Sequence, residues 1–164
     1  MRSMINLNDK QIAEYLRRCY TAVDGLWFMK LEEKYGFDTA LEIDNEVWKV
    51  LPKIQARMLK DMGKLGNGIE ALIACFTTKL TLEGFKFETQ ETENPRGFRI
   101  IIEKCPWLDL LVKSGRENLA EKLGTTICST DCSAWASEFG DNIKFELQGQ
   151  ICQDSEHCIM QFSH

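Results

Sequence analysis

The chain has 164 residues, of which 44% are hydrophobic and 27% charged, as is typical of one globular domain. Its net charge is −5 and the two signs are interleaved, so there is no basic stripe to bind nucleic acid. No segment approaches the roughly 18 consecutive apolar residues of a membrane span. The N-terminal MRSMINLNDKQ also lacks the apolar core of a signal peptide. We therefore expect a single cytoplasmic domain, residues 1–164, with neither nucleic acid nor membrane as a partner.

Residues 1–83 form an expected helical half that begins with one long helix. Asn8 or Asp9 can cap this helix, and Gly36 ends it after about Tyr35. The segment from Leu26 to Met29 is apolar enough that we expect it to be covered on more than one side. One face of the helix has three-to-four spacing and consists of Ile12, Leu16, Cys19, Val23, Leu26 and Lys30.

Two further helices are expected before residue 84. The second would be capped by Asp38 or Thr39, and Pro52 in its middle predicts a kink or a fresh helix start. The GKLGNG stretch, residues 63–68, separates it from the third helix. Gly84 ends that third helix.

Residues 84–164 change period and predict strands. Phe85, Phe87 and Thr89 alternate with polar residues, which is typical of a half-buried strand, and the ETENPRG loop leads to a second strand that ends at Cys105. Short helices are expected from 106 to about 139. Two more strands, near 143–147 and 158–162, would form a C-terminal hairpin. The pattern predicts an α+β fold in which long helices pack on an antiparallel sheet of about four strands.

Five of the seven cysteines lie in the last third of the chain, at positions 105, 128, 132, 152 and 158. Cytoplasmic thiols stay mostly reduced, so a cluster of this kind favours metal binding or catalysis over structural disulfides. The other two, Cys19 and Cys75, lie in helical segments and are expected to be ordinary core residues.

Metal binding is the leading hypothesis for these cysteines. Cys152 and Cys158 flank an expected hairpin tip, which can fix two ligands before a metal binds. Cys128 and Cys132 share one face near the start of an expected helix, and Cys105 follows a strand. Five candidates are thus available for a zinc or iron–sulfur site that needs four.

Two other interpretations remain open for the same residues. Cys132 continues an apolar stripe with Trp135 and Phe139, so it can simply be packed against the sheet, and Cys128 would extend that stripe. A reactive or disulfide-forming pair is the other interpretation. Because packing alone explains Cys132, it is the first candidate to be dropped from the metal site.

Catalysis gives an alternative hypothesis, a hydrolase of a small cyclic or amide substrate. Its nucleophile would be a Cys128 thiolate at a helix N-terminus or a metal-activated water, with Asp131 as the base. An aspartate at this position more often caps a helix. His157 and His164 are poorly placed for a Cys–His pair.

The run from CPWLDLL through TTICSTDCSAW to a strand, C-x5-C and a second strand resembles two related families. One is the 4-vinyl reductase domain family. The other is the family named for L-2-amino-thiazoline-4-carboxylic acid hydrolase, which has a similar Cys-x-x-Asp, here Cys128 to Asp131, and a late cysteine before a strand. The N-terminal EYLRRCYTAVDGLWFMKLEEKYG also resembles uncharacterised cytosolic relatives in anaerobic bacteria and archaea.

This resemblance implies a fold similar to the haem-nitric-oxide-binding and Golgi-trafficking ligand domains, with long helices on a curved antiparallel sheet. It also implies a small-molecule pocket beside a cysteine metal site. Cys132 departs from the pattern, which leaves the ligand set open, and a shared fold does not carry a shared chemistry. A third hypothesis, independent of the resemblance, is a homodimer formed through the apolar face of the first helix at Trp27 to Met29.

Overall fold

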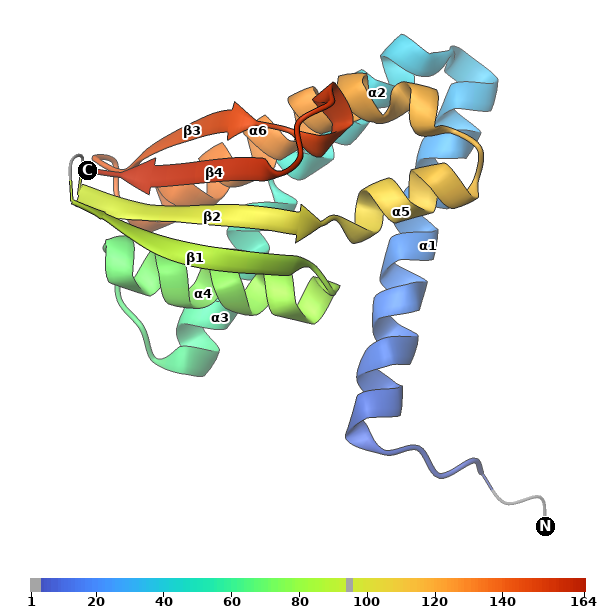
Figure 1. Ribbon diagram of the computed structural model, residues 1–164. Coiled ribbons are helices and arrows are strands. Elements are labelled where there is room, and N and C mark those ends of the chain that lie inside the picture. Colours follow the sequence, from blue (N-terminus) through green and yellow to red (C-terminus); the bar gives the residue numbers. More distant parts are fainter. Residues whose placement is uncertain (1–3, 94–95) are drawn as a thin grey trace. The chain divides into compact units, whose positions relative to one another are not determined.

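The structure is a computed structural model that describes residues 4–93 and 96–164 (Figure 1). It divides into two compact units, one up to Ile43 and one from Asp44 to the C-terminus. The expected halves, 1–83 and 84–164, do not correspond to these units, because the helices between residues 51 and 83 belong with the sheet.

The elements follow in the order helices, hairpin, helices, hairpin. They are α1 (Asp9–Tyr35), α2 (Phe37–Trp48), α3 (Leu51–Gly63), α4 (Ile69–Glu83), β1 (Lys86–Glu93), β2 (Arg96–Lys104), α5 (Pro106–Lys113), the 3₁₀ turn η1 (Glu117–Leu119), α6 (Ala120–Phe139), β3 (Lys144–Gly149), the 3₁₀ turn η2 (Ile151–Gln153) and β4 (Cys158–Ser163). The predicted α+β class is therefore confirmed. None of the helices in the described part of the chain is both long enough and apolar enough to cross a membrane.

The first unit contains α1 and the beginning of α2. Asn8 caps α1 as expected: its Oδ1 accepts a hydrogen bond from the backbone N–H of Gln11 at 2.9 Å, and Gln11 Oε1 accepts one from the Asn8 N–H at 3.0 Å. The expected cap at Asp38 or Thr39 is wrong, because α2 already begins at Phe37. Both residues lie inside its first turn.

Two helices form where the sequence indicated one with a proline in its middle. Helix α2 ends at Trp48, and a second helix, α3, begins at Leu51 with Pro52 in its first turn. Proline is tolerated there because the first N–H groups of a helix have no partner within the helix. Of the two expected outcomes, the fresh start is the one observed.

The second unit is built around one antiparallel sheet with strand order β1-β2-β4-β3. Thr89 pairs with Ile100, Ile100 with Met160, and Met160 with Leu147, so one row of side chains crosses the whole sheet. The two central strands provide the most buried residues of this face. The loop between β1 and β2 is shorter than ETENPRG predicted, since Glu93 pairs with Arg96; residues 94 and 95 lie outside the described residues.

Helices α4 and α6 cover this face of the sheet, and α3 packs against both of them (Figure 1). The contact is largely aromatic: the Phe76 ring of α4 lies 5.3 Å from Trp135 of α6 and 5.2 Å from Phe162 of β4, measured between centroids. All three side chains are fully buried. Aromatic pairs in such edge-to-face geometry add about 1 kcal/mol each beyond the burial of their area.

Helix α6 is longer than expected. The sequence indicated short helices between 106 and 139 with breaks near Gly115 and Gly124. The first break is present, because Gly115 lies in a turn after α5 with φ +67°. Gly124 causes no break, and α6 runs through it for 20 residues. Glycine costs a helix only about 1 kcal/mol, which the burial of Trp135 and Phe139 against the sheet offsets.

We predict that Gly97→Ala destabilises the protein. A Cβ on Gly97, in β2, would overlap the Phe162 carbonyl oxygen of β4, so the central strand pair would have to shift. The free energy of unfolding in urea should fall by about 2 kcal/mol, the usual cost of overpacking. Gly66→Ala is the matched control, because nothing lies within 4 Å of its Cβ position. Equal stability of the two variants would contradict this account.

Candidate functional site

Four of the five predicted cysteines lie around one end of the sheet. Cys105 is the N-cap of α5, directly after β2, and Cys128 lies in α6. Cys152 lies in η2, and Cys158 is the first residue of β4. In the β2–β4 register Cys158 pairs with Ile102, three residues before Cys105. Strand pairing therefore brings these two cysteines to the same end of the sheet.

The turn η2 places Cys152 against α6. A Cβ on Gly124 would lie 2.7 Å from Cys152 Sγ, so the thiol occupies the space that a side chain at position 124 would need. Gly124 is one helical turn before Cys128 and shares its face. Gly124 therefore does not break the helix. Glycine is needed at this position because the missing side chain lets Cys152 approach α6.

The backbone N–H of Ile151 donates a hydrogen bond to Cys158 Sγ at 3.2 Å. The turn between β3 and β4 is therefore folded around the Cys158 sulfur. Backbone N–H groups commonly donate to cysteine sulfurs that hold metals, where they stabilise the thiolate form. The predicted hairpin is confirmed, with the 3₁₀ turn η2 at its tip.

The thiols influence one another electrostatically. Burial raises the pKa of Cys105 to about 11; the backbone amides of Leu108 and Trp107 oppose this shift, and Cys158 and Cys152 add to it. Burial also raises the pKa of Cys128 well above its ordinary value, with further contributions from Cys105, Asp131, Cys158 and Cys152. Burial and then Cys158 raise the pKa of Cys152.

For every pair among Cys105, Cys128, Cys152 and Cys158, a thiolate at one residue would therefore raise the pKa of the other. All four are free thiols, and within residues 4–93 and 96–164 no three His, Cys, Asp or Glu side chains are arranged to hold one metal ion. The four sulfurs thus form a loose group and do not converge on a single point.

Cys132 has a different environment. It is fully buried, and its Sγ lies 3.9 Å from Met160 Sδ on the core face of β4. The apolar stripe with Trp135 and Phe139 that the sequence suggested is present, since all three residues are buried against the sheet. Packing is a sufficient reason for Cys132. Cys75 is buried as expected, whereas Cys19 is exposed, so its expected core role is wrong.

Asp131 is not a helix cap, and Cys128 is not near a helix start. Both expectations are wrong because α6 begins at Ala120, two turns before Cys128. Asp131 is buried, and its Oδ2 lies 2.7 Å from Lys79 Nζ of α4. Its Oδ1 is buried and accepts no hydrogen bond from any described residue.

The sequence analysis missed Lys79 and Glu83, which complete a buried charged group with Asp131. Lys79 Nζ lies 3.6 Å from Glu83 Oε2, and Gln55 Nε2 of α3 donates to Glu83 Oε1 at 3.4 Å. The spacing of these residues could have revealed their burial, because residues 79 and 83 continue the apolar face of α4 that carries Leu72 and Phe76. A lysine and a glutamate on the apolar face of a helix require partners inside the core.

Burial opposes the charged form of Lys79, but Asp131 and Glu83 outweigh it and raise the pKa of the ammonium. Burial raises the pKa of Glu83, to which Asp131 adds, while Lys79 opposes the shift. A carboxyl group whose folded-state pKa is raised destabilises the fold as the pH rises above its ordinary value of 4.5. The Lys79–Asp131 ion pair therefore stabilises the fold, whereas burial disfavours the charged form of Glu83.

The hollows found in the structure lie away from the cysteines. One, of about 280 Å³, lies between the start of α4 and the β1–β2 hairpin, with Ile73, Phe98, Glu91 and Arg96 in its walls. The other lies between the end of α6 and β3. Neither is lined by a cysteine, so the apolar pocket expected beside the metal site has no counterpart in them.

Fold and site together define an α+β protein that carries a group of four free thiols at one end of an open antiparallel sheet, with Cys158 buried and the other three half-buried. The chain belongs to the family described as "Family of unknown function (DUF6125)", which matches residues 6–159. No curated protein and no solved structure matches the chain. The resemblance to the hydrolase and 4-vinyl reductase families stays a prediction.

We predict that Lys79→Met lowers the free energy of unfolding by about 3 kcal/mol, because it leaves Asp131 charged and buried without its partner. The double variant Lys79→Met/Asp131→Leu should recover most of this loss in urea titrations. Lys49→Met is the control, since it breaks the exposed pair with Glu46 and should cost less than about 1 kcal/mol. A double variant no more stable than Lys79→Met would contradict the ion-pair account.

Proposed function

We propose that this is a metal-binding protein whose ligands are Cys105, Cys128, Cys152 and Cys158. The observation that carries the proposal is the gathering of these four thiols from α5, α6, η2 and β4 at one end of the sheet. A bound metal would join the hairpin to both helices. A cytoplasmic location belongs to the same proposal, because that compartment keeps thiols reduced for metal binding.

The spacing of the thiols favours an iron–sulfur cluster over a single zinc ion. Zinc requires each sulfur about 2.3 Å from one point, which places the sulfurs about 3.8 Å apart in a tetrahedron. No three metal-binding side chains among the described residues meet such a requirement. A [4Fe–4S] cluster is larger, and each of its four cysteines binds a different iron atom, so the sulfurs lie farther apart. Four thiols that do not converge on one point are therefore more compatible with a cluster than with a single zinc ion.

The hydrolase alternative gains no support from the site. Cys128 lies within α6 and its thiol pKa is raised, first by burial, so the thiolate needed for attack is disfavoured. Asp131 is occupied by Lys79. The small-molecule ligand expected beside the metal site stays a prediction, and neither of the two hollows described above is lined by a cysteine.

Protein purified without oxygen should contain iron and acid-labile sulfide and absorb broadly near about 400 nm. Cys128→Ser and Cys152→Ser should each lose most of this iron. Cys132→Ala is the matched control, one turn from Cys128 on the same helix, and should keep it. Zinc at one ion per chain would overturn the cluster assignment and keep the four-cysteine site. Absence of any metal, or metal retained in both serine variants, would overturn the site itself.

We also propose that the chain forms a homodimer through α1. The supporting observation is the exposure of large apolar side chains along one face of this helix, including Leu16 at 59%, Leu26 at 56% and Trp27 at 67%. A contiguous apolar surface of this kind marks an interaction site more often than free surface.

Light scattering should give twice the mass of one chain for the wild type and the mass of one chain for Leu16→Glu and Leu26→Glu, because each buries a charge in the interface. Leu82→Glu is the control: Leu82 of α4 is 61% exposed and lies outside the proposed interface. A monomeric wild type at micromolar concentration would refute the homodimer.

A further inference from the structure

The apolar stripe of α1 has the spacing of a coiled-coil seam. Its members, separated alternately by four and three residues, are Ile12, Leu16, Cys19, Val23, Leu26 and Lys30. This spacing averages 3.5 residues, and a stripe with that period stays on one face when two helices wind around each other. A second helix with the same period is therefore the partner that fits it.

The stripe is exposed over its whole length. Ile12 at the start is 43% exposed, Val23 in the middle 54% and Leu26 near the end 56%. Tyr15, Trp27 and Met29 flank it and are also exposed. Together with the stripe they present on the order of 800 Å² of exposed surface, close to the ~800 Å² that each partner buries in a stable interface of standard size. One further helix would therefore suffice as the partner.

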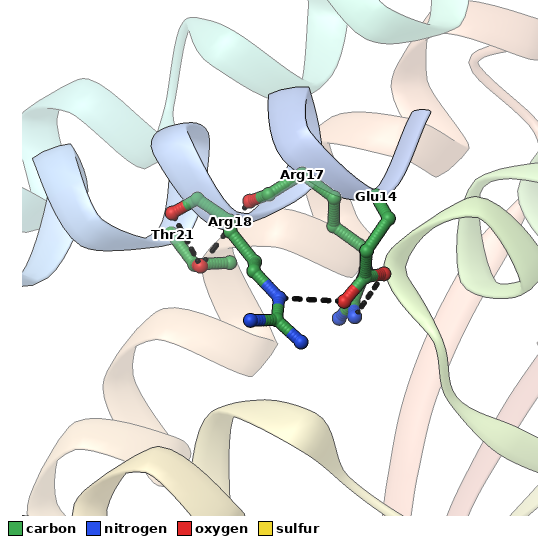
Figure 2. Close-up of polar contacts among 4 residues, drawn as sticks. All are labelled: Glu14, Arg17, Arg18 and Thr21. Carbon is green, nitrogen blue, oxygen red and sulfur yellow. Dashed lines mark hydrogen bonds and ion pairs between the residues drawn. The ribbon is translucent and has the colours of Figure 1, made fainter. Parts of the chain in front are cut away.

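The other face of α1 is polar, and ion pairs within the helix link charged residues on it. Figure 2 shows this face: Glu14 Oε2 lies 2.7 Å from Arg17 Nη2, Glu14 Oε1 lies 2.7 Å from Arg18 Nε, and the Thr21 hydroxyl donates to the Arg17 carbonyl oxygen at 3.2 Å. These charges lie on the side opposite the stripe, so a partner that covers the stripe does not disturb their ion pairs. A partner would therefore contact α1 mainly through apolar side chains of the stripe.

We propose that α1 pairs antiparallel with α1 of a second copy, centred near Thr21. In this register Leu16 faces the partner's Leu26, and Cys19 faces the partner's Val23. The proposal rests on the homodimer proposed above and adds its orientation and register. The interface is isologous, because the same pairs occur on both sides of a two-fold axis.

Lys30 decides the orientation. In a parallel pair each stripe residue meets its own copy, so two Lys30 ammonium groups, each paired with Glu33 of its own helix, would meet at the same end of the contact. In the antiparallel pair Lys30 lies beside the partner's Ile12 at the end of the contact, where its amine reaches water while its methylene groups cover the isoleucine. The two helix dipoles are then antiparallel, which is the favourable arrangement for neighbouring dipoles.

The register is tested by oxidation of Val23→Cys. In the antiparallel pair the new thiol faces the partner's Cys19, so mild oxidation should give a covalent dimer on a non-reducing gel. Wild type, whose two Cys19 thiols lie about 6 Å apart along the axis, should not be cross-linked through this residue. Val23→Cys/Cys19→Ser, the control, should also stay uncross-linked. Because residue 23 is exposed, the variant should fold normally, which circular dichroism checks.

The outcomes separate the register from the homodimer. A dimer by light scattering whose wild type is cross-linked through Cys19 would show a parallel pair and overturn the antiparallel register alone. A dimer that no variant cross-links would place the interface outside α1 and overturn this inference. A monomer would overturn both the homodimer and its register.

Discussion

The ion pair between Lys79 and Asp131 fixes how α6 lies on the rest of the second unit. It joins the inward face of α4 to that of α6 across 2.7 Å, and both side chains are buried. A charged pair in a low-dielectric interior tolerates little displacement, because either partner alone would be strongly destabilising. With this rotation of α6, Cys132 and Trp135 face the sheet and Cys128 faces the other thiols.

The cysteine group is defined by burial. A thiol in an apolar environment has a raised pKa, so Cys105 and Cys128 are poor nucleophiles as they stand. A metal reverses this balance, since its charge stabilises thiolates that burial disfavours. The same surroundings that disfavour a cysteine nucleophile are therefore compatible with the proposed metal site, where the backbone N–H of Ile151 already donates to the Cys158 sulfur.

The two units differ in where their apolar side chains lie. The second has an aromatic core around Phe76 and Trp135, which is buried within the unit. In the first, α1 has a self-paired polar face and an exposed apolar face, which is the reverse of what a helix on the surface of a monomer needs. Metal binding in one unit and self-association in the other are compatible, because they use separate residues.

The sequence by itself determined the α+β class, the two hairpins and the ends of several elements, whereas the pairing of β2 with β4 came from the tertiary structure. Period-two alternation at Phe98 to Ile102, the cap at Asn8 and the restriction that Pro52 places on its neighbours are local effects, so they can be read without the fold. It also gave Cys132 its packing role through the spacing to Trp135. Only the tertiary structure decided the extent of α6 and the role of Asp131. Gly124 and Asp131 are unfavourable for a helix locally, and contacts with Cys152 and Lys79, distant in sequence, explain their presence there. Tertiary contacts of this kind override local preference because burial and buried charge are worth more than helix propensity.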